Sequence, residues 1–185
     1  MKIVIIGSST GGPYILEQIF AKFPQTPICI IIIQHLPSSF TNAFRGHIEA
    51  LTLMKVRVPV QGEQLTEQVI FIAPAGRHMI LERNRTIHFD DGEKLHGVKP
   101  SIDKTMLSLE KRNEDHLAGI ILTGMGQDGA AGIAHIKDLG GLTIVQDLTT
   151  APIKSMPQSA LDTRKVTEIL TPSGITHALI QFGKI

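Results

Sequence analysis

Two short runs of consecutive apolar residues restrict the fold of this chain more than any other feature. Residues 3–6 read IVII, and residues 28–33 read ICIIII. A strand with only apolar side chains must be covered on both faces, as in the parallel sheets of α/β proteins, whereas a half-exposed antiparallel strand alternates polar and apolar residues. We therefore expect both runs to be strands of a parallel sheet.

Each run is followed by a turn and by a helical pattern. Pro13 suits the first turn of a helix, and apolar residues then recur at helical spacing as far as Phe23; residues 40–51 repeat the pattern. Further strands are expected at 117–122, 143–146 and 166–170, and further helices at 102–109, 130–139 and 175–182. Repeated strand–helix units predict an α/β fold with a doubly wound, mostly parallel sheet flanked by helices.

The stretch from Val56 to Phe89 interrupts this alternation. It contains three short β-rich pieces, at 69–72, 78–81 and 86–89, which are separated by turn residues. This texture predicts an antiparallel β-hairpin insertion. With 185 residues and a hydrophobic fraction of 42%, the chain fits one domain over residues 1–185.

Charge and composition exclude several classes of function. The 18 Lys and Arg residues nearly balance the 17 Asp and Glu residues, so we expect no nucleic-acid partner. The single cysteine, Cys29, cannot form an internal disulfide, and its apolar neighbours predict a buried thiol in a reducing compartment. No apolar stretch approaches the roughly 20 residues of a membrane span. We expect a cytoplasmic monomer without membrane insertion.

Three turns that follow predicted strands carry reactive side chains. They read GSSTGGP (7–13), QHLPSSFT (34–41) and TGMGQDGAAG (123–132). Ligands of open α/β sheets bind outside the carboxyl ends of the strands, where these turns are expected to meet. They supply Ser9, His35 and Asp128, which are the residue types of a serine-hydrolase triad.

Each of these residues has a chemical and a purely structural interpretation. The hydroxyl of Ser9 is either a nucleophile or part of a turn that caps the next helix or binds an anion. His35 is either a general base or a histidine bonded to loop backbone. Asp128 either orients the histidine or caps the helix that begins near Ala130. The turns alone leave these alternatives open.

The three turns, with four further segments in the same order, resemble the CheB family of chemotaxis protein-glutamate methylesterases over nearly the whole chain. The further segments are APAGRHMIL (73–81), KPSID (99–103), GGLTIVQD (140–147) and KSMPQSAL (154–161). The resemblance implies that Ser9 is the nucleophile, His35 the base and Asp128 the orienting acid. It places Thr10 and Met125 around the oxyanion, with backbone N–H groups as donors.

The same resemblance implies a reaction and a partner. The enzyme would hydrolyse glutamate 5-methyl esters on the cytoplasmic helices of methyl-accepting chemoreceptors to glutamate and methanol. Some members of the family also deamidate receptor glutamines. The common family layout adds an amino-terminal receiver domain, so a chain that starts at the catalytic strand is expected to be constitutively active, unless residues 56–89 or 149–154 form a lid. Residues 149–157, TTAPIKSMP, are less apolar than in the family.

Other classes of function fit the motifs less well. A nucleotide- or phosphate-binding module would use the first turn, but GSSTGG has neither the dinucleotide glycine pattern nor a P-loop lysine. A non-catalytic receptor-binding adaptor would need no activated serine. We expect no metal and no cofactor, because the other histidines form no HExxH or Cys/His motif, and most of them are expected at the surface. These are His47, His78, His88, His96, His116, His135 and His177.

Overall fold

A seven-stranded parallel sheet forms the centre of the computed structural model, which describes residues 1–185. All neighbouring strands are parallel, which confirms the predicted sheet. The two apolar runs pair at its centre as β1 and β2, where every residue of β2 is buried. In spatial order the strands are β3 (Lys55–Arg57), β4 (Val69–Ile72), β2 (Cys29–Gln34), β1 (Lys2–Ser8), β7 (His116–Ile121), β8 (Leu142–Gln146) and β9 (Glu168–Leu170).

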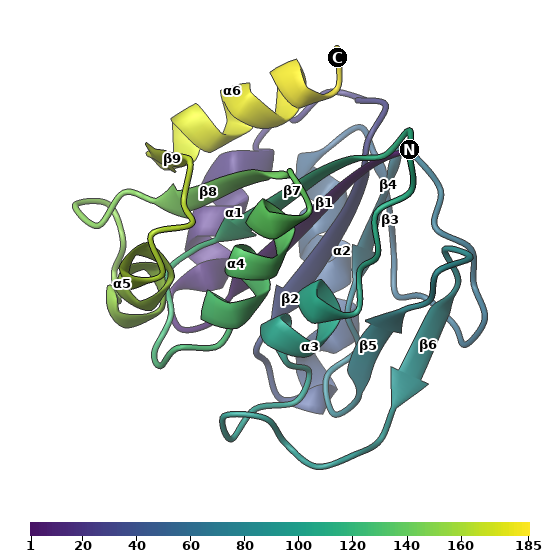
Figure 1. Cartoon of the computed structure of the whole chain (residues 1–185). Coiled ribbons are helices and arrows are strands. Elements are labelled where there is room, and N and C mark those ends of the chain that lie inside the picture. Colours follow the sequence, from purple (N-terminus) through teal and green to yellow (C-terminus); the bar gives the residue numbers. More distant parts are fainter.

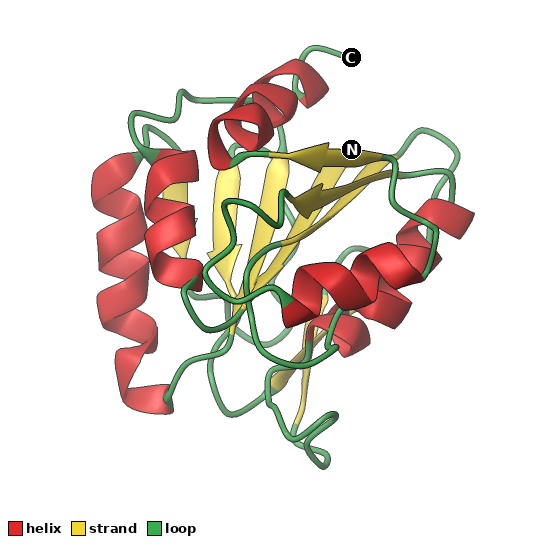
Figure 2. Ribbon diagram, turned by 90° about the vertical axis from the view of Figure 1, so that its left-hand side faces the viewer, coloured by secondary structure: helices red, strands yellow, loops and turns green.

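Helices cover both faces of this sheet (Figures 1 and 2). One face packs against α1 (Gly12–Phe20), α2 (Thr41–Leu51), which follows the short 3-10 helix Ser38–Phe40, and α6 (Pro172–Phe182). The other face packs against α3 (Ile102–Leu107), α4 (Ala130–Asp138) and α5 (Ser155–Asp162), together with a small hairpin. Each face buries a cluster of 23 hydrophobic residues, and this equal burial explains why the central strands are apolar at consecutive positions.

Successive side chains of β1 show the division between the two cores. Val4 and Ile6 belong to the cluster under α1, α2 and α6, whereas Ile3 and Ile5 belong to the opposite cluster. Side chains of a strand alternate between faces, so an all-apolar strand serves two cores at once. Cys29 lies in the second cluster with no exposed surface, which confirms the predicted buried thiol.

The hairpin insertion is smaller than predicted. Only β5 (His78–Leu81) and β6 (Ile87–Asp90) form an antiparallel pair. Residues 69–72 are instead β4 of the main sheet, where they pair in parallel with β2 and β3. All four residues of β4 are buried, and this consecutive burial is the signature of a two-sided parallel strand rather than of a hairpin.

Helix α5 was not predicted from the sequence. Its apolar positions are few, and Pro157 resembles a helix breaker. Pro157 is the third residue of the helix, and a first-turn proline gives up only an N–H that has no helical acceptor. No helix of the chain has both the length and the apolar character that crossing a membrane requires.

Candidate active site

The order of the strands brings the three predicted site residues to one edge of the sheet. The chain moves from β1 to β2 on one side, and β7 pairs with β1 on the other side. The carboxyl ends of strands at such a switch point border a crevice in open α/β sheets. Ser9 follows β1, His35 follows β2 and Asp128 lies in the loop after β7.

His35 and Asp128 are in direct contact. The Nε2 atom of His35 lies 2.9 Å from Oδ2 of Asp128. In a pairing with a carboxylate oxygen, which accepts, the imidazole nitrogen is the donor. The other ring nitrogen, Nδ1, is buried and has no hydrogen-bond partner within the chain. With its proton on Nε2, His35 is left with a free lone pair on Nδ1, so it can act as a base at that atom.

Ser9 lies next to His35 at the end of the neighbouring strand. The N–H of His35 donates to the carbonyl of Ser8 at 3.1 Å, and adjacent parallel strands are about 4.8 Å apart. The Ser9 backbone is held on both sides, since its N–H donates to the Thr123 carbonyl at 3.0 Å and its carbonyl accepts from the Gln34 amide at 2.9 Å. Its half-buried hydroxyl makes no hydrogen bond.

The turn does not use Ser9 as a helix cap. The N-cap of α1 is Gly11, with a φ of 80°, and no side chain caps this helix. Glycine is suited to this left-handed conformation, which lets the chain turn from β1 into α1. Gly124 is required for a different reason, because a Cβ atom there would lie 2.7 Å from the Cβ atom of Ser9. The two glycines therefore leave room for the serine side chain.

Asp128 is surrounded by donors rather than placed at the start of α4. That helix has Gly129 as its N-cap, with no side-chain cap. The carboxylate instead accepts from the Ser101 hydroxyl at 2.8 Å, from the N–H groups of Ile102 and Asp103 at 2.7 and 3.0 Å, and from His35. Burial acts to raise the pKa of Asp128, but these hydrogen bonds outweigh it and lower the pKa below its ordinary value. Asp128 is therefore held as a carboxylate.

Thr10 and Met125, the two residues predicted to surround the oxyanion, have exposed side chains. Neither backbone N–H donates to an acceptor within the chain. The atypical segment 149–157 supports both turns. The Thr123 hydroxyl lies 3.0 and 3.1 Å from the carbonyl oxygens of Thr10 and Ile153, and its single proton can be donated to either. The N–H of Gly124 donates to the Ile153 carbonyl at 3.2 Å. Free N–H groups on braced turns are what an oxyanion requires.

Two ionisable residues beside Asp128 were not singled out from the sequence. Asp103 is buried, and its Oδ2 lies 3.3 Å from Nε2 of His96. Burial raises the pKa of Asp103 above its ordinary value, so the two neighbouring aspartates are shifted in opposite directions. Ligand atoms of His96, Asp103 and Asp128 lie within 4.8 Å of one another. Both oxygens of Asp128 and Oδ1 of Asp103 already accept hydrogen bonds, whereas Oδ2 of Asp103 is approached only by His96. A metal ion bound to Asp128 would have to share or displace the donors of that carboxylate.

The prediction that most other histidines lie at the surface is confirmed, and His78 is the buried exception. Its side chain is fully buried, because the β5–β6 hairpin carries it beneath α3. Ser101, which the KPSID segment contains, was also not singled out as a site residue. The signal that could have indicated Ser101 is its position at the start of a predicted helix, because the N-cap of a helix offers donors to a carboxylate.

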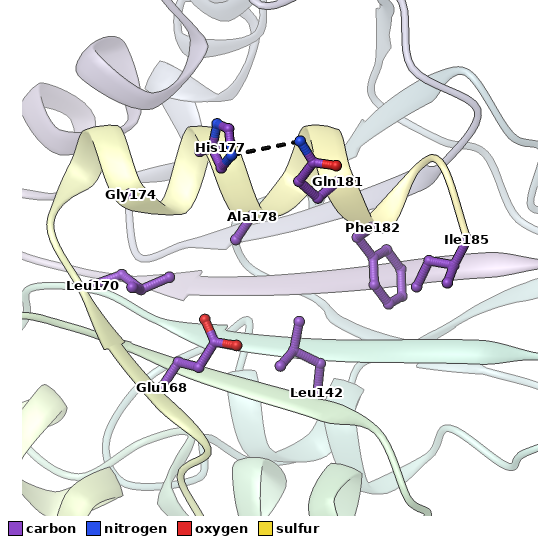
Figure 3. Close-up of a pocket in the computed structure, with 9 residues that line it drawn as sticks. All are labelled: Leu142, Glu168, Leu170, Gly174, His177, Ala178, Gln181, Phe182 and Ile185. Carbon is purple, nitrogen blue, oxygen red and sulfur yellow. Dashed lines mark hydrogen bonds between the residues drawn. The ribbon is translucent and has the colours of Figure 1, made fainter.

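His35 and Asp128 line a shallow polar cleft of about 420 Å³, whose other lining residues are His96, Val98, Met125, Gly126, Gln127 and Ser159. Ser9 follows the neighbouring strand β1 and is not one of the residues that line this cleft. Phe40 is 56% exposed near the second turn, whereas Met156 is buried. A larger hollow of about 640 Å³ lies elsewhere, between α6 and the β8–β9 edge of the sheet (Figure 3). Leu142, Leu170 and Phe182 make that hollow mainly apolar, and no nucleophile–base pair faces it. The chemistry therefore points to the smaller cleft.

Comparisons with known proteins agree with this geometry. A family model described as CheB methylesterase matches residues 4–179. A protein-glutamate methylesterase/protein-glutamine glutaminase of Clostridium acetobutylicum is 35% identical, over 98% of this chain and 53% of that protein; one of Archaeoglobus fulgidus is 36% identical over the same shares. The chain thus spans about half the length of the curated relatives it matches.

A solved structure gives the same answer for the fold. The crystal structure of the Thermotoga maritima CheB methylesterase catalytic domain matches with a TM-score of 0.90 and 32% identity, over 97% of each chain. This structure is therefore similar to the chain in both fold and sequence. Because the family model covers nearly the whole sheet, from the first strand to the last helix, this chain belongs to the CheB methylesterase family.

Proposed function

We propose that this protein is a serine esterase that hydrolyses glutamate 5-methyl esters on chemoreceptor proteins, releasing methanol and leaving a free glutamate. The observation that carries the proposal is the state of His35: Nε2 is bonded to Asp128, and the buried Nδ1 has no hydrogen-bond partner within the chain. Ser9 begins the turn at the end of the adjacent strand, where the N–H of His35 donates to the Ser8 carbonyl at 3.1 Å. Family membership supports the choice of substrate, because the relatives are named protein-glutamate methylesterases.

In the first half of the reaction, the Ser9 oxygen attacks the ester carbonyl while Nδ1 of His35 takes the hydroxyl proton. The imidazolium that forms is stabilised by Asp128, which remains ionised. Collapse of the tetrahedral intermediate breaks the bond to the methoxy oxygen, which takes the proton from Nδ1 and leaves as methanol. An acyl-enzyme remains on Ser9.

In the second half, water attacks the acyl-enzyme and gives its proton to Nδ1 of His35. The Ser9 oxygen then leaves with that proton, and the receptor glutamate is released. The negative charge of both tetrahedral intermediates would be met by the free N–H groups of Thr10 and Met125. An amide carbonyl passes through a similar intermediate, so deamidation of receptor glutamines is part of the proposal, as the names of the relatives suggest.

The partner under this proposal is the cytoplasmic helical region of a methyl-accepting chemoreceptor, with the enzyme acting from the cytoplasm as a monomer. The shallow, open cleft supports a protein substrate, because a glutamate side chain on a helix surface can enter it without an enclosing pocket. The test is methanol release from methylated receptor membranes, with Ser9→Ala as the matched control. Release by the native protein and none by Ser9→Ala is expected; equal release by both would contradict the proposal.

A further inference from the structure

His78 lies on β5, outside the triad, and its imidazole is fully buried. Its Nδ1 atom lies 3.1 Å from the backbone nitrogen of Ser101, and its Nε2 atom lies 2.9 Å from the carbonyl oxygen of Glu93. A backbone N–H can only donate, and a carbonyl oxygen can only accept. His78 is therefore a neutral imidazole with its proton on Nε2, and both of its nitrogens are satisfied.

Ser101 connects this ring to the triad. Its N–H donates to His78, and its hydroxyl donates to Oδ1 of Asp128 at 2.8 Å. Ser101 is also the N-cap of α3, so its position sets the direction of the next two N–H groups, those of Ile102 and Asp103, which donate to the same carboxylate. A displacement of Ser101 would move three of the four donors to Asp128.

We propose that His78 is a positioning residue of the active site, which holds the Ser101 backbone so that these three donors converge on Asp128 and Asp128 orients His35. The inference rests on the proposed esterase function. His78 touches neither the substrate cleft nor the reacting atoms, so its effect passes entirely through Ser101. The β5–β6 hairpin, which stands outside the parallel sheet, thereby gains a role in catalysis.

The interface between α3 and β5 supplies an internal control. The Thr105 hydroxyl donates to the Met79 carbonyl at 2.8 Å, and the N–H of Leu81 donates to the Ser108 hydroxyl at 2.9 Å. Ser108 is the C-cap of α3, at the opposite end from Asp128. Ser108→Ala therefore weakens the same interface without touching a donor to the carboxylate.

Two substitutions of His78 separate its two hydrogen bonds. In His78→Asn the amide oxygen, attached to Cγ, can take the place of Nδ1 and still accept from Ser101. In His78→Gln the amide lies one bond further out, in the place of Nε2, so the contact with Glu93 can persist while Ser101 loses its acceptor. Both substitutions replace a buried imidazole by a buried amide, but Asn is one methylene smaller than Gln and leaves the larger cavity. Loss of packing alone would therefore impair His78→Asn more than His78→Gln, which is the opposite of the order expected from the hydrogen bond to Ser101.

The experiment measures methanol release from methylated receptor membranes with the native chain, His78→Gln, His78→Asn and Ser108→Ala, well below their unfolding temperatures. His78→Gln is expected to lower kcat about 10-fold with KM unchanged, in the range typical of residues that orient active-site ligands. His78→Asn should recover most of that loss, and Ser108→Ala should keep the native kcat. Equal losses in Gln and Asn, or a loss in Ser108→Ala as large as in His78→Gln, would overturn the inference.

A measurement on the native chain does not depend on the variants folding. Nitrogen-15 spectra of the imidazole rings should show His78 as a single neutral form protonated on Nε2; a proton on Nδ1 would overturn the inference. Failure of the proposed function is recognised separately, since the native chain would then release no methanol. In that case the rate at which a fluorophosphonate labels Ser9 replaces kcat in the comparison of the four chains.

Discussion

A buried aspartate lies near each end of strand β7. Each has a neighbouring side chain with a buried polar atom that makes no hydrogen bond, but the chemical nature of that atom differs between the two ends. Asp115, just before the strand, pairs with Arg85, and their side chains are only 5% and 3% exposed. The Nε and Nη1 atoms of Arg85 have no acceptor. Asp128, beyond the other end, receives four donors, and the unpartnered atom beside it is Nδ1 of His35.

This difference indicates a structural role for the Arg85–Asp115 pair and a chemical role for the His35–Asp128 pair. The guanidinium of arginine stays protonated, so the free Nε and Nη1 groups of Arg85 cannot take up a proton. The Nη2 group pairs with Asp115 and holds the hairpin turn against the start of β7. The free nitrogen of His35 is a lone pair that can take one up. We therefore expect substitutions near Asp128 to affect turnover and substitutions near Asp115 to affect stability.

The largest effect is expected from Ser9→Ala or His35→Ala. Because a nucleophile and its base act as one unit, either change should remove nearly all turnover, by about 10⁶-fold as in a well-studied serine protease. Methanol release gives the rate, and circular dichroism should give an unchanged fold. Turnover by Ser9→Ala at the native rate would show that the triad assignment is wrong.

Asp128→Asn should cost less than either of these changes. The amide can still occupy the site, but it no longer stabilises the imidazolium or selects the Nε2–H form of His35, an effect of about 10⁴-fold in serine proteases. The rate of Ser9 labelling by a fluorophosphonate should fall in parallel with methanol release. Native activity in this variant would place the orienting acid elsewhere.

Breaking the Arg85–Asp115 pair at the other end of β7 should lower stability and leave turnover unchanged. Arg85→Met leaves Asp115 buried without its partner and should lower the free energy of unfolding by about 3–5 kcal/mol, with kcat of the folded protein unchanged. Urea unfolding measures the first quantity. The matched control is Arg85→Met combined with Asp115→Leu, which should restore most of the stability. A specific loss of kcat in either variant would remove the distinction between the two ends.

The ionised forms of both aspartates should each make a small contribution to the free energy of unfolding, which is lost on acidification. Burial raises the pKa of each, but hydrogen bonds, chiefly from His35 to Asp128 and from the Arg112 N–H to Asp115, leave both below the ordinary 3.8. A lowered folded-state pKa stabilises the fold fully above pH 3.8, and this stability is lost as the pH falls through the lowered value. Asp128→Asn should therefore lose less stability than the native chain between pH 5 and pH 2 in urea titrations. An identical loss would exclude this contribution.

The smallest effect is expected from chelation. His96, Asp103 and Asp128 could in principle offer ligands, but hydrogen bonds already occupy both oxygens of Asp128 and one oxygen of Asp103. Methanol release should survive exhaustive treatment with EDTA, because the proposed oxyanion donors are backbone N–H groups. Activity that disappears and returns with added Zn²⁺ would show that a metal contributes at the Asp128 end of β7.

Much of the site follows from local pattern, and the remainder from packing. Ser9 could be predicted because it lies in a glycine-rich turn after the apolar run 3–6, and His35 because it comes shortly after the apolar run 28–33. The burial of His78 cannot be predicted from its own segment, because it results from the docking of the hairpin against α3. The expected place of residues 69–72 in the hairpin is wrong because a short apolar run fits more than one kind of strand, and only its pairing with β2 and β3 distinguishes them.

The sequence by itself determined the parallel sheet, because strands that are apolar on both faces have no other stable place, and it determined which turns carry Ser9, His35 and Asp128. Only the tertiary structure decided what holds Asp128 and which nitrogen of His35 remains free. These contacts join residues far apart in the chain, 93 positions in the case of His35 and Asp128. They exist only once α3 and the hairpin have packed onto the sheet, and no local periodicity encodes that docking.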